Sequence, residues 1–247
     1  MFFVDADDTV KPDYFRRLAG VLEDSGADFA LSSFDYAPLK RDYNLSGNAA
    51  VREAMLPAFY GYSFEDVRRW NRGGDLFARR EQGGVWRCAF RRDFLERHGI
   101  RFDERLRLYE DAPFIAECAV HAEKVASIPD RLYEYVPGPG GILATSLGTR
   151  RHWEYKFAAL AARKAIDERA GGGLAAWCAA SHVLSAMEML RLWRKAGLSF
   201  AEFRRDMAEY LGDEDVSAAL KAFPLSPRHP AAAAAAMLLR ALSPRRR

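Results

Sequence analysis

The sequence contains little cysteine and no long apolar run. Its three cysteines, Cys88, Cys118 and Cys178, lie too far apart for a metal site, so we expect buried free thiols in a reducing compartment. No segment approaches the roughly 20 apolar residues of a membrane-spanning helix. Acidic residues begin at Asp5, which excludes a signal peptide. We therefore expect a cytoplasmic protein, either free or peripheral at the inner face of the membrane.

The sequence also lacks a strong excess of either charge. The formal net charge is +3, and only seven of the 37 basic residues are lysine. This balance excludes a nucleic-acid binder of the strongly basic kind and permits an anionic substrate. The hydrophobic fraction of 49% is that of a globular chain, long enough for a domain with an appendage.

The beginning of the chain has the pattern of a strand, a helix and a second strand. The short apolar run 2–4 predicts a buried strand that is covered on both faces. A helix is expected from near Pro12, a favourable first-turn residue, to Gly26, and a strand at 28–34. Asp5, Asp7 and Asp8 would follow the carboxyl end of the first strand, where open α/β sheets bind ligands.

The predicted secondary structure changes from mixed α/β to helical near residue 150. Before that point we expect a short helix capped by Ser63, a strand at 85–90, helices from 91 and 113, short strands at 125–129 and 132–135, and a loop at 137–141. After it we expect helices at 153–169, 174–196, 200–211 and 231–242, with a proline-rich linker at 224–230. The predicted division is an α/β domain at 1–147 and a helical appendage with a basic tail at 148–247.

The acidic turn Asp5-Ala6-Asp7 is compatible with a metal site and with a purely structural turn. Carboxylates at a strand end suit Mg²⁺ or Mn²⁺, with a substrate diphosphate completing the coordination shell. Such a cation neutralises the charge that grows on a departing nucleoside diphosphate. The structural alternative is a solvated turn whose acids favour the start of the following helix. The turn alone does not decide between them.

A third interpretation of the turn is the first motif of haloacid dehalogenase-type phosphatases. Asp5 would then be the nucleophile, with Thr9 as the last residue of the motif. That interpretation requires a serine or threonine at the end of a second strand, which 32–33 supplies. It also requires a well-placed lysine, and neither Lys40 nor Lys124 has a suitable context.

Four blocks of the sequence, in order, resemble characteristic segments of family 2 glycosyltransferases. Residues 3–14 resemble the central Asp-Ser-Asp-Asp turn, which leads through a proline into a helix. Residues 84–95 are similar to the tryptophan-containing strand and the basic residues after it. The segment that ends in Glu110-Asp111 resembles the Glu-Asp signature, and 132–135 resembles the closing Tyr-x-Tyr strand.

The resemblance implies a partial GT-A, Rossmann-like nucleotide-diphospho-sugar transferase domain and a transfer with inversion. Asp7 would be the main ligand of Mg²⁺ or Mn²⁺, Asp5 would face the ribose or diphosphate, and Asp8 would support the metal shell. Asp111 would be the general base that takes the proton of the acceptor hydroxyl, and Glu110 would help to hold Asp111 or the acceptor. The structural alternative for this pair is an acidic helix start.

Trp86 and Arg87 are the candidate substrate contacts. Trp86 could be a platform for a sugar ring, and core packing is an equally good interpretation of an aromatic residue in a strand. The family often has Asn-Lys after the tryptophan, where this chain has Arg87-Cys88. It also often has a basic or amide residue after Tyr-x-Tyr, where this chain has Val136-Pro137. These departures put substrate contacts at those positions in doubt.

In the family, a Rossmann-like half that binds the nucleotide base precedes the acidic turn. Because only four residues precede Asp5 in this sequence, we expect a truncated chain, from a misassigned start or a degraded gene rather than a protein completed by a second chain. Such a chain would bind donor poorly and would expose an apolar sheet edge. At the other end, Leu238, Leu239 and Leu242 with Arg240 and the tail 245–247 could contact anionic headgroups, and a frayed basic tail is the simpler interpretation.

The sequence therefore predicts a metal-dependent, inverting glycosyltransferase of bacterial cell-surface polysaccharide biosynthesis. Its partners would be a nucleotide-sugar donor and a glycan or lipid-linked glycan acceptor, and no nucleic acid. The alternatives are the phosphatase and a non-catalytic pseudo-transferase that only binds partners or glycans.

Overall fold

The described residues form two compact units. The structure, a computed structural model, describes residues 1–35, 38–81, 83–136, 145–146 and 148–244. Unit 1 consists of Met1–Tyr60 and Arg79–Gly138, and unit 2 of Gly61–Ala78 and Pro139–Arg247. The predicted α/β class is confirmed. The boundary at 147/148 stays a prediction, and the structure assigns Gly61–Ala78 to the helical unit.

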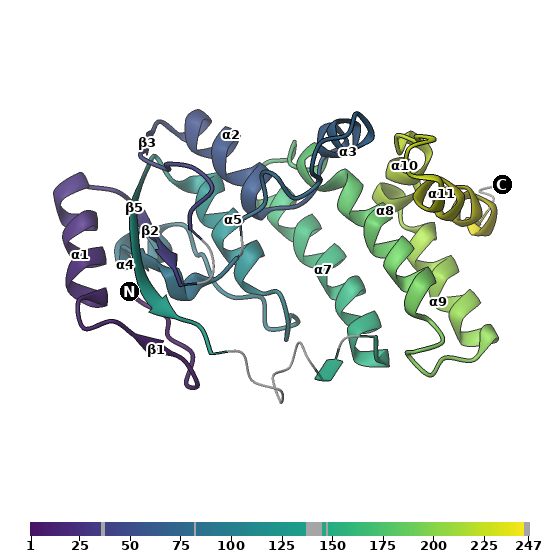
Figure 1. Cartoon of the computed structure of the whole chain (residues 1–247), viewed down its shortest axis with the longest axis horizontal. Coiled ribbons are helices and arrows are strands. Elements are labelled where there is room, and N and C mark those ends of the chain that lie inside the picture. Colours follow the sequence, from purple (N-terminus) through teal and green to yellow (C-terminus); the bar gives the residue numbers. More distant parts are fainter. Residues whose placement is uncertain (36–37, 82, 137–144, 147, 245–247) are drawn as a thin grey trace. The chain divides into compact units, whose positions relative to one another are not determined.

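Unit 1 is a mixed sheet with helices on both faces (Figure 1). Its strands are in the order β1-β5-β2-β4, and β3 also pairs with β5. The pair β2–β5 is parallel, and the other strand pairs are antiparallel. The elements are β1 (Thr9–Val10), α1 (Tyr14–Ser25), β2 (Phe29–Phe34), β3 (Leu45–Ser46), α2 (Asn48–Phe59), the 3₁₀ turn η1 (Val85–Arg87), β4 (Cys88–Phe90), α4 (Arg92–Arg97), α5 (Asp111–His121) and β5 (Lys124–Glu134).

Helix α1 covers one face of the sheet. Its buried side chains, Tyr14, Leu18 and Leu22, lie four residues apart and therefore form one stripe. They belong to a core cluster that includes Phe34 of β2. Gly26 ends the helix in the left-handed conformation, with φ of 67°, and its N–H donates to the Leu22 carbonyl. The predicted end of this helix is confirmed.

Aromatic packing joins the other face of the sheet to α5. The Phe29 ring of β2 stacks on the Phe90 ring of β4, with centroids 5.7 Å apart. Phe90 in turn meets Phe114 of α5 edge-on at 5.4 Å. Helix α5 also packs against α2. The start of α5 is thereby fixed relative to the sheet, and this start carries Glu110 and Asp111.

The prediction of a fully buried strand at 2–4 is wrong. Only Phe2 pairs, in an isolated antiparallel bridge to Ala89. Phe2 and Phe3 are half-buried, and Val4 is 43% exposed. Among the described residues, β4 is the strand that this segment pairs with, so the segment lies at the edge of the sheet.

Three other expectations also need correction. The two short strands expected between 125 and 135 are a single strand, β5. Where a break between two strands was expected, the pairing of β5 with β2 shifts register opposite Ser32–Phe34 instead. The segment expected to be one strand at 85–90 begins as the turn η1. Helix α2 was not predicted, because Pro57 lies inside it and its buried residues run consecutively from Met55 to Phe59 rather than along one stripe.

Unit 2 is helical. Its elements are α3 (Phe64–Asn71), α7 (Arg150–Arg169), α8 (Ala175–Leu192), α9 (Phe200–Gly212), α10 (Glu214–Ala222) and α11 (Pro230–Leu242). Val67 of α3 shares a core cluster with Trp153, Val183 and Met207. The capping box predicted at Ser63 is confirmed, since Asp66 is its partner. Among the described residues, no helix is both long and apolar enough to cross a bilayer. Helix α10 was not predicted.

One buried histidine makes the stability of unit 2 depend on pH. His182 on α8 is 3% exposed, and burial lowers its pKa to about 4. An unfolded histidine has a pKa of about 6.5, so the unfolded chain binds the proton more readily. The free energy of unfolding should therefore fall as the pH drops from about 6.5 to about 4, by on the order of 3 kcal/mol. Urea-unfolding midpoints across this range should decrease less in His182→Gln than in the wild-type protein. Equal slopes for the two proteins would contradict the assignment.

Candidate active site

The acidic turn is anchored to the end of β5 by one hydroxyl group. The Tyr133 hydroxyl accepts a hydrogen bond from the Asp5 N–H at 3.0 Å and donates one to Asp8 Oδ2 at 2.8 Å. The Val136 N–H donates to Asp8 Oδ1 at 2.7 Å. Both Asp8 oxygens are thus engaged within the protein, whereas Asp5 and Asp7 are exposed. Asp8 therefore has a positioning role in this structure, in addition to any part in a metal shell.

The second acidic segment is at the amino-terminal end of α5. Glu110 is the N-cap residue and Asp111 is the first residue of the helix. The preceding residue, Tyr109, is in the left-handed conformation with φ of 63°, which is uncommon for a residue with a side chain. The Val85 backbone lies close enough to the Asp111 carboxylate to act against the rise of its pKa. The helix start and η1 together orient this carboxylate.

The two acidic segments interact electrostatically. Partial removal of the exposed Asp5 carboxylate from water raises its pKa, and the charges of Asp8, Asp7 and Glu110 raise it further. Burial raises the pKa of Asp111 to about 7, with additional contributions from Glu110 and Asp5. The segments lie far apart in the sequence, and the fold brings them into one cluster of like charges.

The chemistry of the cluster suits a divalent cation bound together with a phosphate ligand. In the described part of the chain, no basic side chain forms an ion pair with Asp5, Asp7, Glu110 or Asp111. Among the same residues, no group of three or more acidic, histidine or cysteine side chains is arranged to hold a metal ion. Two exposed carboxylates leave coordination positions for diphosphate oxygens and water, as is usual for Mg²⁺. The protein residues therefore fit a shared site rather than a closed metal cage.

Trp86 lies in the core of unit 1 rather than on a surface. It is 5% exposed and stacks on Tyr133, with ring centroids 4.4 Å apart, and on Tyr135 at 5.9 Å. A Cβ at Gly84 would overlap the Trp86 ring, so the tryptophan requires a glycine two residues earlier. Of the two interpretations of Trp86, the structure favours core packing. The ring supports Tyr133 and so, indirectly, the acidic turn.

Arg87, the second expected substrate contact, has internal partners in this structure. Arg87 is completely buried. Its Nε donates to the Ser32 carbonyl at 2.8 Å, one guanidinium nitrogen lies 3.6 Å from a Glu81 carboxylate oxygen, and the group lies 5.1 Å from the Phe34 ring centroid. Glu81 also accepts from the Tyr43 hydroxyl at 3.0 Å. A charge this deeply buried needs a partner, and Glu81 supplies it.

Two features of the site were not predicted. The Tyr133 hydroxyl was expected only as part of a closing strand, because a tyrosine in a strand gives no sign of which backbone it will bind. The left-handed Tyr109 carries no sequence signal, since its neighbours are neither glycine nor asparagine. The Tyr-x-Tyr pair at 133–135, where β5 ends, was the only hint of the first.

The chain is similar in sequence to a succinoglycan biosynthesis protein and to a glycosyltransferase. No family model matches it. It is 30% identical over 143 residues to the succinoglycan biosynthesis protein ExoO of Rhizobium meliloti (strain 1021). It is 28% identical over 144 residues to the uncharacterized glycosyltransferase EpsJ of Bacillus subtilis (strain 168). The alignments cover 56% and 57% of this chain and 38% of each relative. The chain thus spans well under half the length of these relatives.

Solved structures of S. aureus TarS show a weaker likeness. The complex of TarS 1–349 with UDP-GlcNAc superimposes with a TM-score of 0.40 at 14% identity, covering 98% of this chain and 57% of that chain. The complex with UDP gives a TM-score of 0.39 at 13% identity, covering 93% of this chain and 51% of that chain. A TM-score this low does not define a shared fold, so the similarity to glycosyltransferases is carried by the sequence.

Removal of the Tyr133 hydroxyl should loosen the acidic turn without disturbing the aromatic stack. In Tyr133→Phe the Asp5 N–H and Asp8 lose their shared partner, which should lower the free energy of unfolding by about 2 kcal/mol. Amide hydrogen exchange at Asp5 should become faster. Tyr135→Phe is the matched control, because Tyr135 also stacks on Trp86 and should leave exchange at Asp5 unchanged. Equal exchange at Asp5 in Tyr133→Phe and wild type would contradict the anchoring role.

Proposed function

We propose that this chain is the metal-binding and acceptor-binding part of a glycosyltransferase of polysaccharide biosynthesis. The protein would transfer a sugar from a nucleotide-sugar donor to a glycan or lipid-linked glycan, with inversion, on a partial GT-A fold. The observation that carries the proposal is the cluster formed by Asp5, Asp7, Glu110 and Asp111. The similarity to ExoO and EpsJ supports the same class of reaction.

Asp111 is the group best suited to act as general base. A base is most effective when its pKa lies near the working pH, and the pKa of Asp111 is raised to about 7. Its carboxylate would take the proton of the acceptor hydroxyl while the acceptor oxygen forms a bond to the anomeric carbon. The bond from that carbon to the donor diphosphate would break on the opposite face. The negative charge of Glu110 makes Asp111 more basic, which gives Glu110 a role without contact with substrate.

Asp5 and Asp7 are the residues that would hold Mg²⁺ or Mn²⁺. Both are exposed, and the charge of Asp7 contributes to the raised pKa of Asp5. When bound, the cation would neutralise the charge on the departing nucleoside diphosphate. Asp8 would keep the turn in place through Tyr133 and Val136.

The phosphatase alternative receives less support from the geometry. The Thr9 hydroxyl donates to Glu134 at 2.7 Å. The Ser32 and Ser33 side chains are buried and bonded to the Arg87 carbonyl and the Leu39 N–H. Each of the hydroxyl groups that this mechanism would use is thus bonded elsewhere. In the other alternative, a pseudo-transferase that only binds partners or glycans, the protein would have this fold and would catalyse no transfer.

Replacement of Asp111 by Asn should remove the base and leave the shape of the site intact. We expect kcat to fall by roughly 10²–10⁴-fold, with donor affinity nearly unchanged. In the wild type, kcat should rise as the pH increases through about 7, because Asp111 must lose its proton to act, and this limb should vanish in Asp111→Asn. The measurement is steady-state transfer of sugar from a nucleotide-sugar donor to a glycan acceptor. Glu117→Gln, a change elsewhere on α5, is the control.

Unchanged kcat in Asp111→Asn would remove this residue from the role of base. Release of phosphate from a simple phosphomonoester, abolished by Asp5→Asn, would instead support the phosphatase. A donor-binding protein that shows neither activity would support the non-catalytic alternative.

Replacement of Asp7 by Asn should weaken metal binding. Loss of one of two carboxylate ligands should raise the apparent Mn²⁺ activation constant by about tenfold or more. Asp13→Asn is the matched control, because Asp13 is an exposed acid that pairs with Arg16 outside the cluster. An activity that survives chelation of divalent cations, or an activation constant that is equal in Asp7→Asn and wild type, would contradict the assignment.

A further inference from the structure

The start of α9 in unit 2 presents aromatic side chains at the surface. Phe200 is the first residue of this helix and is 60% exposed. Its ring lies 6.3 Å from the rings of Phe203 and Trp193, and Trp193 stacks on Phe203 at 5.0 Å. We refer to Trp193, Phe200 and Phe203 as the aromatic corner. The exposed Phe200 ring packs beside the buried Phe203 and the partly buried Trp193, and it is an apolar projection.

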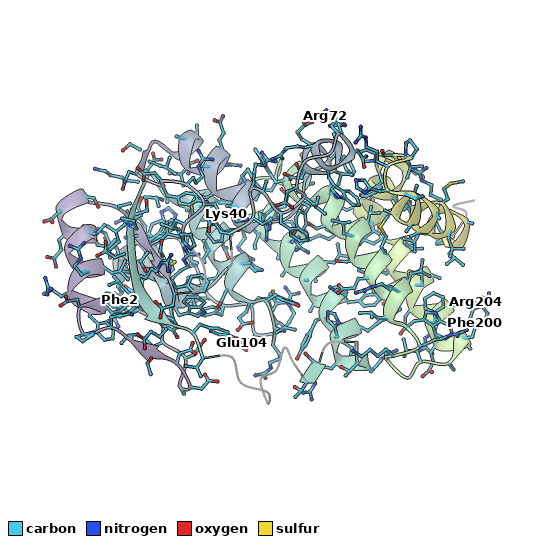
Figure 2. The ribbon with its side chains drawn as sticks, viewed as in Figure 1. Phe2, Lys40, Arg72, Glu104, Phe200 and Arg204 are labelled. Atoms are coloured by element: carbon cyan, nitrogen blue, oxygen red, sulfur yellow. The ribbon has the colours of Figure 1, made fainter. Side chains whose placement is uncertain are left out.

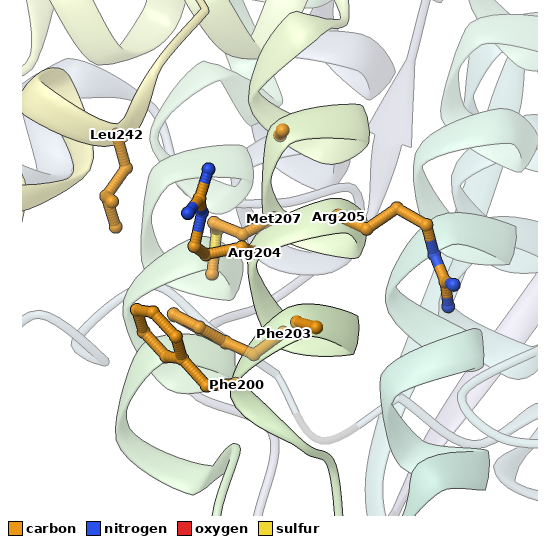
Figure 3. Close-up of a pocket in the computed structure, with 8 residues that line it drawn as sticks. Phe200, Phe203, Arg204, Arg205, Met207 and Leu242 are labelled. Atoms are coloured by element: carbon orange, nitrogen blue, oxygen red, sulfur yellow. The ribbon is translucent and has the colours of Figure 1, made fainter.

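A groove of about 490 Å³ extends the apolar surface beside Phe200. Figure 3 shows Phe200, Phe203 and Met207 on one side of the groove and Leu242 of α11 on the other. The groove-lining residues are Phe200, Ala201, Phe203, Arg204, Arg205, Met207, Ala208 and Leu242. Apart from the two arginines, the lining is apolar, so contact with water is unfavourable along the whole groove.

Cations flank the aromatic corner. The Arg194 guanidinium lies 5.3 Å from the Trp193 ring centroid. Arg204 is exposed, and it lies one helical turn after Phe200 on the same side of α9 (Figure 2). In the described part of the chain, neither arginine forms an ion pair, whereas the neighbouring Arg205 pairs with Asp206. The nearest acid in the helix, Glu202, is held in the capping box of Ser199. Glu202 keeps its own negative charge, but Arg194 and Arg204 outnumber it, so the corner carries net positive charge.

The membrane contact expected on α11 stays a prediction, and the structure leaves only part of its residues at the surface. Leu239 is completely buried, and Arg240 donates to the carbonyls of Leu220, Lys221 and Phe223 at the end of α10. Only Leu238, at 48% exposure, and the groove-lining Leu242 remain accessible from that set. The tail 245–247 lies outside the described residues. The exposed combination of aromatic and basic groups is on α9 instead.

We propose that the aromatic corner of α9 docks on an anionic lipid surface. Aromatic rings flanked by arginines match the boundary between acyl chains and negatively charged headgroups. Phe200 enters this boundary, while Arg194 and Arg204 contact lipid phosphates. Two features favour a lipid surface over an acidic helix of another protein. The groove follows only about two turns of α9, between residues 200 and 208, and Phe200, one of its lining residues, is 60% exposed and so accessible to an apolar layer outside the groove.

This inference does not depend on sugar transfer, so it can be tested on the chain itself. The experiment is flotation of the protein with vesicles of phosphatidylcholine alone and of phosphatidylcholine mixed with phosphatidylglycerol. We expect binding only to the anionic vesicles, and weaker binding at higher salt. Phe200→Ala should reduce the partition coefficient by about tenfold or more, and Arg204→Gln by about fivefold.

Controls separate the corner from the rest of unit 2. Met237→Ala removes an equally exposed apolar side chain from α11, and Arg228→Gln removes an exposed arginine away from α9. Both should bind as the wild type does, and all variants should keep the wild-type thermal unfolding midpoint. Absence of binding to anionic vesicles would overturn the proposal. Binding that survives Phe200→Ala would also overturn it, because that result assigns attachment to charge elsewhere. Self-association that Phe200→Ala abolishes would identify a second copy of the chain as the occupant instead.

Discussion

The candidate site depends on a single hydrogen-bonding group, the hydroxyl of Tyr133. This hydroxyl is both acceptor for the Asp5 N–H and donor to Asp8, so it connects the two ends of the acidic turn to β5. The Tyr133 ring is completely buried and stacked on Trp86, which leaves the hydroxyl little freedom to move. The parallel pairing of β5 with β2, and the packing of the sheet against α5, then bring the turn to Glu110 and Asp111.

The electrostatic energy of the resulting carboxylate cluster is unfavourable in the absence of a cation. This energy is the link between the structure and the proposed function. Carboxylates in close proximity, partly removed from water, repel one another, and the repulsion raises the pKa values of Asp5 and Asp111. A fold selected for stability alone would place an arginine among them, as it does where Glu81 accompanies the buried Arg87. A site that binds a cation together with a phosphate-bearing substrate needs carboxylates without an arginine partner. The contrast between these two acidic environments in one unit supports a binding role for the cluster.

Local signals and resemblance predicted different parts of this molecule. The stripe of α1, the glycine that ends it and the capping box at Ser63 follow from local rules and are confirmed. The acidic residues on two distant segments came from resemblance, because no periodicity relates Asp5 to Asp111. Burial of Arg87 could not be predicted, since its counter-charge Glu81 precedes it in a segment without a clear pattern. The exposed Val4 and the missed α2 show the limit of apolar periodicity where a sheet edge or an internal proline intervenes.

The central claim is that the acidic turn and the start of α5 form one cation-binding centre. Paramagnetic broadening of backbone amide resonances by substoichiometric Mn²⁺ tests it most directly on the chain itself. The account predicts selective broadening of both Asp5–Asp8 and Glu110–Asp111, because one ion would lie near both segments, and its loss in Asp7→Asn. Broadening of only one segment, or of acidic residues elsewhere with these two unaffected, would contradict the account.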